Sequence, residues 1–232
     1  MGQRAGWVGW VAILSVVIAC VQESLPRQAF DEKVRHSIRK IALLQVRAPK
    51  VLILPGGALA GPLLGAAAND SNTSLFNARV ESQRLALGRE LAEAIQDDLK
   101  GSPYALVFLE YERPRNDGTG ADVDYSPIST DADAILDVSI RVAGFSGAGF
   151  ADYRPWLLVD AHLVSAASKA SLYAQSFSYG NLSVSRDVEH FQSSPKYAYG
   201  SFNELFEKSG EAADGIRAGI APIAARIAAE LR

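Results

Sequence analysis

The feature that most constrains the fold is a run of three alternating segments between residues 134 and 180. In AILDVSIRV, apolar side chains at every second position alternate with Asp137, Ser139 and Arg141. WLLVDAHLVSA and ASLYAQSFSYG repeat the alternation, and SAASK (165–169) connects them. A period of two is typical of strands with one buried face, and so short a connection joins antiparallel neighbours. The sequence therefore predicts an antiparallel unit whose polar face is in contact with water.

Three further segments extend the predicted sheet. KIALLQV (40–46) is almost continuously apolar, which is typical of a strand buried on both faces. KVLILPGG (50–57) predicts a short strand that its own proline and glycines terminate. YALVFLEYE (104–112) predicts another strand. Residues 113–130 and 181–200 carry turn-forming residues, so we expect loops there.

Two long helices are predicted. Residues 76–100 place leucine or isoleucine at every fourth position, with acidic residues on other faces. The last helix begins at Ser201, where Ser201 and Glu204 have the spacing of a capping box, and Pro222 predicts a kink. The apolar stripes are Leu87, Leu91, Ile95 and Leu99 in the first helix, and Ile216, Ile220, Ile223, Ile227 and Leu231 in the second.

The order of these segments predicts the architecture. The chain has 232 residues, of which 48% are hydrophobic, enough for one complete core. Strands, a helix, further strands and a final helix predict an α+β domain. We expect a mostly antiparallel sheet of about five strands, with two long helices packed on one face, in a single periplasmic domain over residues 40–232.

Charge and cysteine content exclude several classes of partner and site. The net charge is −3 with a pI near 5.7, and no cluster of Lys and Arg is present to neutralise phosphates. We therefore expect no nucleic-acid partner. One cysteine allows neither an intramolecular disulfide nor a zinc site with several cysteines.

That cysteine, Cys20, follows a short N-terminal segment with one arginine and a mostly apolar run over residues 5–19. The run has the length of a secretory signal and is shorter than the roughly 20 residues of a membrane-spanning helix. Its end, Val17-Ile18-Ala19-Cys20, resembles the lipobox of bacterial lipoproteins. The resemblance implies a signal peptide over residues 1–19, cleavage between Ala19 and Cys20, and a lipid anchor on the Cys20 thiol. The alternatives are an ordinary signal peptide or an uncleaved anchor helix.

The residues after the lipobox define the expected attachment to the membrane. Val21 follows Cys20, which in enterobacterial-type sorting implies the outer membrane, with the domain on the periplasmic face. Residues 20–39 are mostly polar and are expected to form the lipidated N-terminus and a tether. The Gly- and Ala-rich stretch 56–74 has two interpretations: a loop that contacts lipid or a partner, or a connection or helix packed through small residues.

Few residues indicate chemistry. Asp160 and His162 lie two apart on one strand and so share a face, where an acid could orient an imidazole for base catalysis. No nucleophile or metal-ligand motif accompanies them, so an ordinary polar sheet face is the favoured interpretation. Residues 116–124 have the composition of a calcium loop but not its spacing, and turn chemistry explains them equally well. Asp131 and Asp133 are expected to terminate a loop. We expect no catalytic residue, metal site or cofactor.

Aromatic side chains on the predicted strands allow a binding groove, although packing in the core is their commoner role. These residues are Tyr153, Trp156, Tyr173, Phe177 and Tyr179.

Three stretches carry a family resemblance: ADAILDVSIRVAGF (132–145), residues 153–181, and IRAGIAPIAARIAAELR (216–232). They resemble a group of uncharacterised proteobacterial lipoproteins. More distantly, the order of elements is similar to the periplasmic domains of curli-secretion lipoproteins and penicillin-binding-protein activator lipoproteins. The resemblance concerns the fold and implies no site residue.

The expected function is that of a lipid-anchored envelope protein that binds a partner protein during envelope assembly or maintenance. A lipid-anchored periplasmic hydrolase and a subunit of an oligomeric export complex are the alternatives. A cavity around His162 would favour the hydrolase, and an unpaired strand edge would favour binding of a partner strand.

Overall fold

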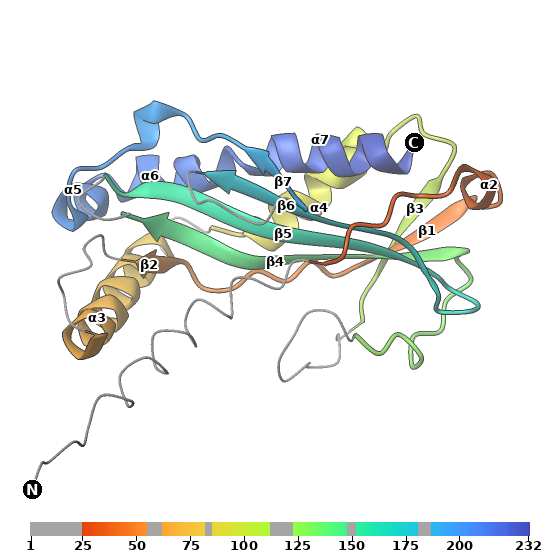
Figure 1. Ribbon diagram of the computed structural model, residues 1–232, viewed down its shortest axis with the longest axis horizontal. Coiled ribbons are helices and arrows are strands. Elements are labelled where there is room, and N and C mark those ends of the chain that lie inside the picture. Colours follow the sequence, from red (N-terminus) through yellow and green to blue (C-terminus); the bar gives the residue numbers. More distant parts are fainter. Residues whose placement is uncertain (1–24, 55–61, 82–84, 112–122, 148–151, 181–186) are drawn as a thin grey trace, which may run out of the picture.

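The computed structural model describes residues 25–54, 62–81, 85–111, 123–147, 152–180 and 187–232 (Figure 1). The strands are β1 (Lys40–Leu44), β2 (Leu52–Leu54), β3 (Ala105–Leu109), β4 (Ala134–Ser146), β5 (Arg154–Ser165), β6 (Ser171–Gly180) and β7 (Val188–Phe191). The helices are α2 (Glu32–Arg35), α3 (Pro62–Glu81), α4 (Leu87–Asp98), α5 (Phe202–Glu207), α6 (Ser209–Arg217) and α7 (Ile220–Leu231), with a 3-10 turn at Pro195–Tyr197.

The described strands form one seven-stranded mixed sheet in the order β3-β1-β4-β5-β6-β7, with β2 also paired to β4. The predicted antiparallel unit is confirmed: β4 pairs with β5, and β5 with β6, in antiparallel register. The prediction of a mostly antiparallel sheet of about five strands is wrong for the strands outside this unit. The pairs β1–β3, β1–β4, β2–β4 and β6–β7 are all parallel. Strand β1 lies between two parallel neighbours, which is why it is apolar on both faces.

The prediction of two long helices is only partly correct. Only α3 is long, with 20 residues, and it includes much of the Gly- and Ala-rich stretch. The predicted helix over residues 76–100 divides into the end of α3 and the separate helix α4, which begins at Leu87. The first turn of α4 packs closely on the chain after β1, because a Cβ at Gly88 would lie 2.3 Å from the Val46 carbonyl oxygen. Such a close approach of two backbones is not visible in a periodic pattern.

The C-terminal helix is divided into α5, α6 and α7, and its main break differs from the predicted kink at Pro222. The break lies at Ala218 and Gly219, and Pro222 is the third residue of α7. A proline in the first turn removes an N–H that has no intrahelical partner, so it starts a helix without distorting it. The predicted N-cap is confirmed, since the Ser201 side chain accepts from the Glu204 N–H, but the Glu204 carboxylate accepts from the Gly200 N–H and not from that of Ser201.

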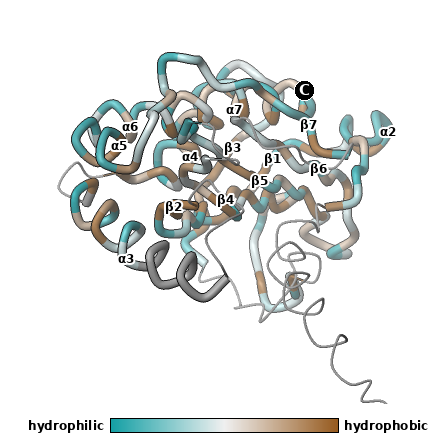
Figure 2. The backbone as a smooth tube through the Cα atoms, turned by 60° about the vertical axis from the view of Figure 1, so that its left-hand side comes forward, coloured by the Kyte–Doolittle hydropathy of each residue, from teal (hydrophilic) through white to brown (hydrophobic). Residues whose placement is uncertain are grey.

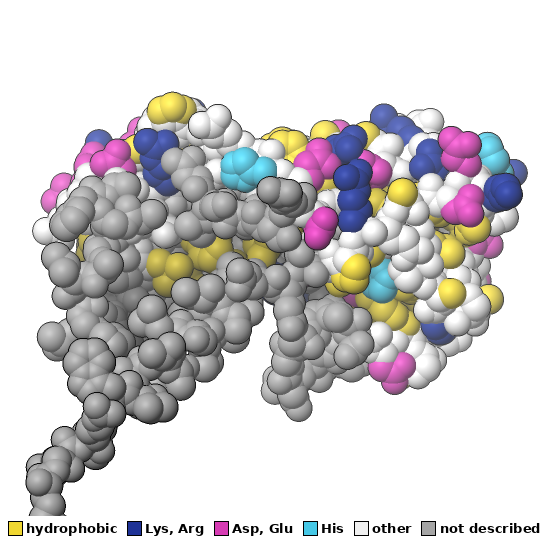
Figure 3. Space-filling model, in the orientation of Figure 1, with side chains coloured by type: hydrophobic (Ala, Val, Ile, Leu, Met, Phe, Trp, Pro, Cys, Tyr) yellow, Lys and Arg dark blue, Asp and Glu magenta, His cyan; other side chains and the backbone are white. Residues whose placement is uncertain are grey.

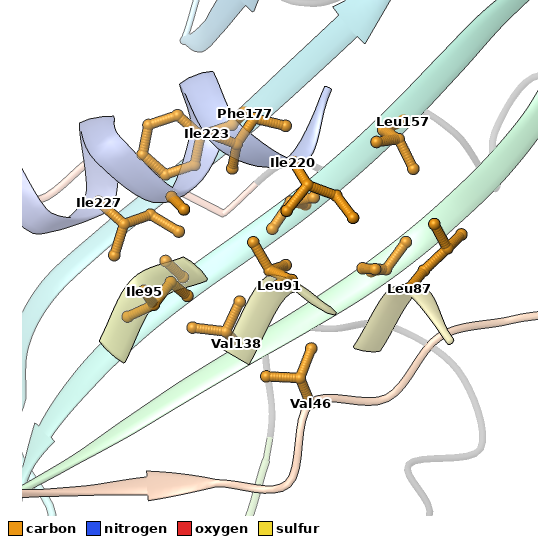
Figure 4. Close-up of a cluster of buried hydrophobic side chains, with 14 of the residues drawn as sticks. Val46, Leu87, Leu91, Ile95, Val138, Leu157, Phe177, Ile220, Ile223 and Ile227 are labelled. Carbon is orange, nitrogen blue, oxygen red and sulfur yellow. The ribbon is translucent and has the colours of Figure 1, made fainter. Parts of the chain in front are cut away.

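Helices α4, α6 and α7 cover one face of the sheet and enclose the main core (Figure 1). The predicted stripes Leu87–Leu91–Ile95 and Ile220–Ile223–Ile227 point at each other and at Val138, Leu157 and Phe177 of the sheet (Figure 4). Hydrophobic residues concentrate along the central strands, while α5 and the outer turns of α6 are more polar (Figure 2). Burial of both stripes confirms that they pack inside the molecule.

The N-terminal residues from Leu25 onward lie against the sheet instead of extending away from it. Leu25, Phe30 and Ile38 are buried, and the backbone of Gln28 forms an antiparallel bridge with Ala174 of β6. The part of the predicted tether over residues 25–39 is therefore packed on the domain. Among the described residues, no helix is long and apolar enough to cross a membrane.

Candidate functional site

Polar side chains line the face of the sheet opposite the main core. Asp137 and Asp160 on this face are only 3% and 5% exposed, so the prediction that the face contacts water is wrong for these two residues, whereas Ser139, Arg141 and His162 are partly exposed. Tyr125 and Ile128 cover part of the face and form a second, smaller core with Ile135. A buried carboxylate is stable only when it is hydrogen bonded or paired. Both aspartates accordingly have hydrogen-bond partners, Tyr125 for Asp137 and Ser176 for Asp160.

Asp137 ends a chain of hydrogen bonds that we call the Gln28 relay. The Tyr125 hydroxyl lies 2.8 Å from Asp137 Oδ2 and 3.1 Å from His162 Nδ1. His162 Nε2 lies 2.9 Å from Ser171 Oγ, which donates to Gln28 Oε1. The relay thus joins strands β4, β5 and β6 to the loop before β4 and to the N-terminal segment.

Asp160 belongs to a second chain of contacts. Its Oδ1 accepts a 2.6 Å hydrogen bond from Ser176, and its Oδ2 lies 3.5 Å from Arg141. The Ser176 hydroxyl oxygen also accepts from the backbone N–H of Leu25 at 3.0 Å. Both aspartates therefore take part in fastening the N-terminal segment to the sheet.

Asp160 and His162, which the sequence predicted as a pair, both lie on β5. The two residues share a face, as expected, but the carboxylate that reaches His162 through Tyr125 is Asp137, directly across from it in the β4–β5 register. Sequence analysis missed Asp137, Tyr125 and Ser171 as partners. Asp137 sits at the opposite register position, so pairing the two strands from their alternation would have found it. No local signal indicated Tyr125.

The Ser171–His162 contact raises the question of a nucleophile. The Ser171 hydroxyl donates to Gln28, so its hydrogen is not directed at the imidazole. Neither the cavity between α3 and the start of α4 nor the cavity beside β3 is lined by Ser171 or His162. Among the described contacts the Ser171 proton is therefore directed at an amide oxygen, whereas acyl transfer at a serine requires it to be directed at a base.

The other predicted positions have structural roles or lie outside the described residues. Asp133 Oδ2 accepts from the backbone N–H groups of Arg39 and Lys40, and these bonds lower the pKa of its carboxyl. Asp131 forms an ion pair with Lys40 at 2.6 Å, and the hydrogen bond within that pair lowers the Asp131 pKa. Both acids thus terminate the loop, as predicted, and they fix the start of β1.

Of residues 116–124, which have the composition of a calcium loop without its spacing, only 123 and 124 are described, and Asp124 accepts from the Ser126 N–H as in an ordinary turn. Among the described residues no cluster of three metal-ligating side chains occurs. Most of the predicted aromatic residues belong to the protein interior: Tyr173, Phe177 and Tyr179 are core members, Trp156 is buried, and Tyr153 is partly buried against the core. Ala19 and Cys20 lie outside the described residues.

Strand β3 forms an edge of the sheet. It pairs with β1 on one side, and the described part of the chain places no strand on the other. The Ala105 N–H donates to the Arg39 carbonyl, so alternation within a parallel pair turns the N–H and C=O groups of Leu106 and Phe108 away from β1. All five residues of β3 are apolar, and Phe108 is 50% exposed. We call this outward side of β3 the open edge.

A groove of about 780 Å³ runs beside the open edge. Its walls are Ala92 and Gln96 of α4, the chain after β1, and Phe108 with the residues that follow it. Glu93 and Glu110 are exposed at the groove, and Arg89 is the one described basic residue that lines it. Elsewhere on the visible described surface, acidic and basic side chains lie mixed (Figure 3). The groove is therefore apolar with a slightly acidic border.

Comparisons with known proteins give distant structural matches only. No family model and no curated protein sequence matches the chain. A DUF330 protein of Xanthomonas campestris is 8% identical, with a TM-score of 0.35 over 82% of this chain and 81% of its own. A hypothetical protein of Chlamydia trachomatis is 10% identical, with a TM-score of 0.40 over 84% and 98%. A lipoprotein of Neisseria meningitidis is 13% identical, with a TM-score of 0.22 over 60% and 81%.

These TM-scores all lie below 0.5, so the matches assign neither a fold family nor a function to this chain. The resemblance to curli-secretion and penicillin-binding-protein activator lipoproteins stays a prediction.

Proposed function

We propose that this protein is a lipid-anchored component of the bacterial cell envelope whose domain binds an extended segment of a partner protein at β3. The observation that carries the proposal is the open edge, which combines outward backbone groups, an apolar strand and an adjoining groove. Edge strands are usually blocked by charge, proline or a covering element, because an unblocked edge pairs with other chains. In strand addition, backbone hydrogen bonds supply affinity and side-chain pockets supply specificity.

The size of the edge sets the expected affinity. Leu106 and Phe108 offer four backbone groups, each worth about 0.5–1.5 kcal/mol when bonded. One apolar side chain in the groove adds about 1.5–3 kcal/mol. After the cost of ordering the segment, binding falls in the micromolar to millimolar range.

The geometry favours a flexible segment over a second copy of the domain. A stable complex of two folded proteins buries at least about 1,200 Å², more than a five-residue strand provides. An extended segment can follow both the strand and the groove. Because Glu93 and Glu110 border the groove, we expect the segment to be apolar with flanking Lys or Arg.

The test uses synthetic peptides and the full chain purified in detergent. A peptide of about seven residues, alternating Val and Phe between two lysines, should bind in the micromolar to millimolar range by fluorescence anisotropy. Its backbone N-methylated form, with identical side chains, should not bind, since methylation removes the hydrogen-bond donors. Equal binding of both peptides would refute strand addition. Concentration-dependent dimers of the unliganded chain in sedimentation would identify a second copy as the occupant instead.

The lipid anchor is tested at Cys20. Cys20→Ala removes the thiol to which the lipid is attached, so we expect loss of labelling with a fatty-acid probe and release from the membrane fraction. Ser15→Ala, within the apolar run, is the matched control and should retain both. Unchanged membrane association of Cys20→Ala would contradict the anchor. It would not affect strand addition, which the peptide experiment tests. Placement in the outer membrane, facing the periplasm, follows from Val21 and is checked by separating the two membranes.

A further inference from the structure

We propose that the Gln28 relay is a proton-operated latch for the N-terminal segment. The Asp137–His162 pair binds one proton more than an ionised carboxylate and a neutral imidazole carry, and this proton fastens Gln28 to the sheet. The inference is independent of strand addition at β3.

The four contacts of the relay need four hydrogens if each is a hydrogen bond. The Gln28 amide contributes none, because its Nε2 donates to the Ser171 carbonyl oxygen at 2.9 Å and thereby turns Oε1 toward the hydroxyl. Ser171, Tyr125 and a neutral His162 supply one hydrogen each, and an ionised Asp137 supplies none. Three hydrogens do not fill four contacts. The fully bonded relay therefore holds one extra proton.

The extra proton has two possible positions, which are equivalent for the latch. On His162, both ring nitrogens donate and the Tyr125 hydroxyl donates to the Asp137 carboxylate. On Asp137, the carboxyl donates to Tyr125, which donates to His162 Nδ1. In both cases His162 Nε2 donates to Ser171, and Ser171 donates to Gln28. The Gln28 contact thus depends on the extra proton.

Loss of this proton should break the relay at its exposed end. Tyr125 and Asp137 are buried, and a hydrogen bond left unmade there is costly. Ser171 and Gln28 are exposed, so water can replace a contact between them. Raising the pH therefore removes the contact between Ser171 and Gln28 Oε1 while the buried end stays bonded. Gln28 is then held less firmly, by its Nε2 contact and its backbone pairing with Ala174.

Other charged groups surround the relay. Among the described residues these include Arg141 and Asp160 of the sheet, which form an ion pair, and Lys169 of the hairpin, which donates to the Ile128 carbonyl. Asp124 and Arg27 are the chain neighbours of Tyr125 and Gln28. Lys and Arg keep their charge between about pH 5 and pH 8, and Asp160 is held by Arg141 and Ser176. His190, which contacts Ser178 at 2.9 Å on β6, is a second imidazole in the same region and needs its own control.

The latch sets how far the domain stands from a lipid on Cys20, a consequence that rests on the proposed anchor. With Leu25 fastened, the four residues 21–24 span at most roughly 14 Å. Phe30, two residues after Gln28, is buried in the main core and is the next point at which the chain is attached to the domain. With the segment released as far as Phe30, the nine residues 21–29 span at most roughly 30 Å.

Hydrogen exchange of the full chain tests the latch directly. Gln28 and Ala174 donate to each other's carbonyls at 2.8 and 3.0 Å, so their amides report on the fastened segment. Protection factors, corrected for the intrinsic pH dependence of exchange, should fall roughly threefold to tenfold between about pH 5 and pH 8. In Ser171→Ala the fall should disappear. In the matched variant Ser178→Ala, which removes the His190 contact, it should remain.

Equal protection of Gln28 at both pH values in the native chain would overturn the proposal. So would an unchanged fall in Ser171→Ala, because the relay would then not transmit it. If Ser171→Ala weakened protection throughout the sheet, the variant would disturb the fold as a whole. Gln28→Ala is then used instead, with exchange of the Ala174 amide as the measurement. In that variant, a surviving pH dependence again contradicts the latch.

Discussion

The edges of the sheet at β2 and at β3 differ in whether the protein itself supplies hydrogen-bond partners for their outward backbone groups. At β2, helix α3 covers the edge: Asn77 accepts from the Val51 N–H at 3.0 Å and donates to its carbonyl at 2.7 Å. Thr73 accepts from the Ile53 N–H at 3.0 Å. One asparagine amide thus pairs with a strand backbone as a neighbouring strand would. At β3, the described structure provides no such cover, although the strand is equally apolar.

The covered edge should therefore contribute mainly to folding stability, and the open edge mainly to partner binding. Backbone groups that the protein itself satisfies contribute to folding, and breaking those contacts costs stability. Backbone groups turned outward on a half-exposed strand contribute little until another chain supplies the partner. Substitutions at the covered edge should therefore unfold the protein, and substitutions at the open edge should mainly weaken binding.

The largest expected loss of stability comes from truncating a side chain in the main core, on which both edges of the sheet depend. Ile220 is 6% exposed and lies between α4 and the sheet (Figure 4). Ile220→Ala should lower the free energy of unfolding by about 2–5 kcal/mol and the melting temperature by several degrees. Thermal melts check this, with the exposed Ala221→Ser as control. An unchanged melting temperature would mean that α7 does not pack as described.

The covered edge is tested at Asn77. Asn77→Ala leaves the N–H and C=O of the buried Val51 without their partners, so stability should fall by about 2–4 kcal/mol. Ser74→Ala, at an exposed position of the same helix, should change it by less than about 0.5 kcal/mol. Urea titrations measure both. A small loss for Asn77→Ala would show that the covered edge contributes no more than the open one.

The open edge is tested by adding charge. Phe108→Lys should keep stability within about 0.5 kcal/mol, yet weaken peptide binding more than about tenfold, because edge lysines oppose strand pairing. Leu52→Lys on β2 is the matched control, since Leu52 is 39% exposed at the covered edge. It should leave peptide affinity unchanged. Equal weakening by both variants would place the binding site elsewhere.

The smallest effect concerns Tyr199, beneath the covered edge. Its ring packs on Phe145, and its buried hydroxyl has no hydrogen-bond partner among the described residues. Burial raises the Tyr199 pKa from 10.0 to about 12, so its contribution to stability is complete below pH 10 and is lost as the pH rises through 12. Tyr199→Phe should leave stability at neutral pH unchanged or slightly raised. In alkaline melts its decline should be shallower, and an identical decline would contradict the assignment.

Local patterns predicted the β4–β5–β6 unit and the two buried stripes because neighbouring segments alone determine them. The parallel pairing of β1 with β3 and β4 joins segments far apart in the chain, so no alternation indicated it. Strand β7 has only four residues and carries turn-forming neighbours. Its pairing with β6 was therefore missed.

The candidate site was less predictable than the fold. Asp137, Asp160 and His162 look like an ordinary solvent-facing row, and only the covering segments around Leu25 and Tyr125 make them a buried network. The open edge depends on strand order, because the same apolar β3 in the middle of the sheet would have no outward groups. Both features arise from tertiary contacts that are absent from the local sequence.

Hydrogen exchange at the two edges tests the central claim most directly. In the full chain without peptide, the Leu106 and Phe108 amides should exchange fast, whereas the Val51 and Ile53 amides should be protected by Asn77 and Thr73. Adding the lysine-flanked peptide should protect Leu106 and Phe108 and leave Val51 and Ile53 unchanged. Slow exchange of Leu106 and Phe108 before peptide is added, or no change after saturation, would contradict an open edge that binds a partner strand.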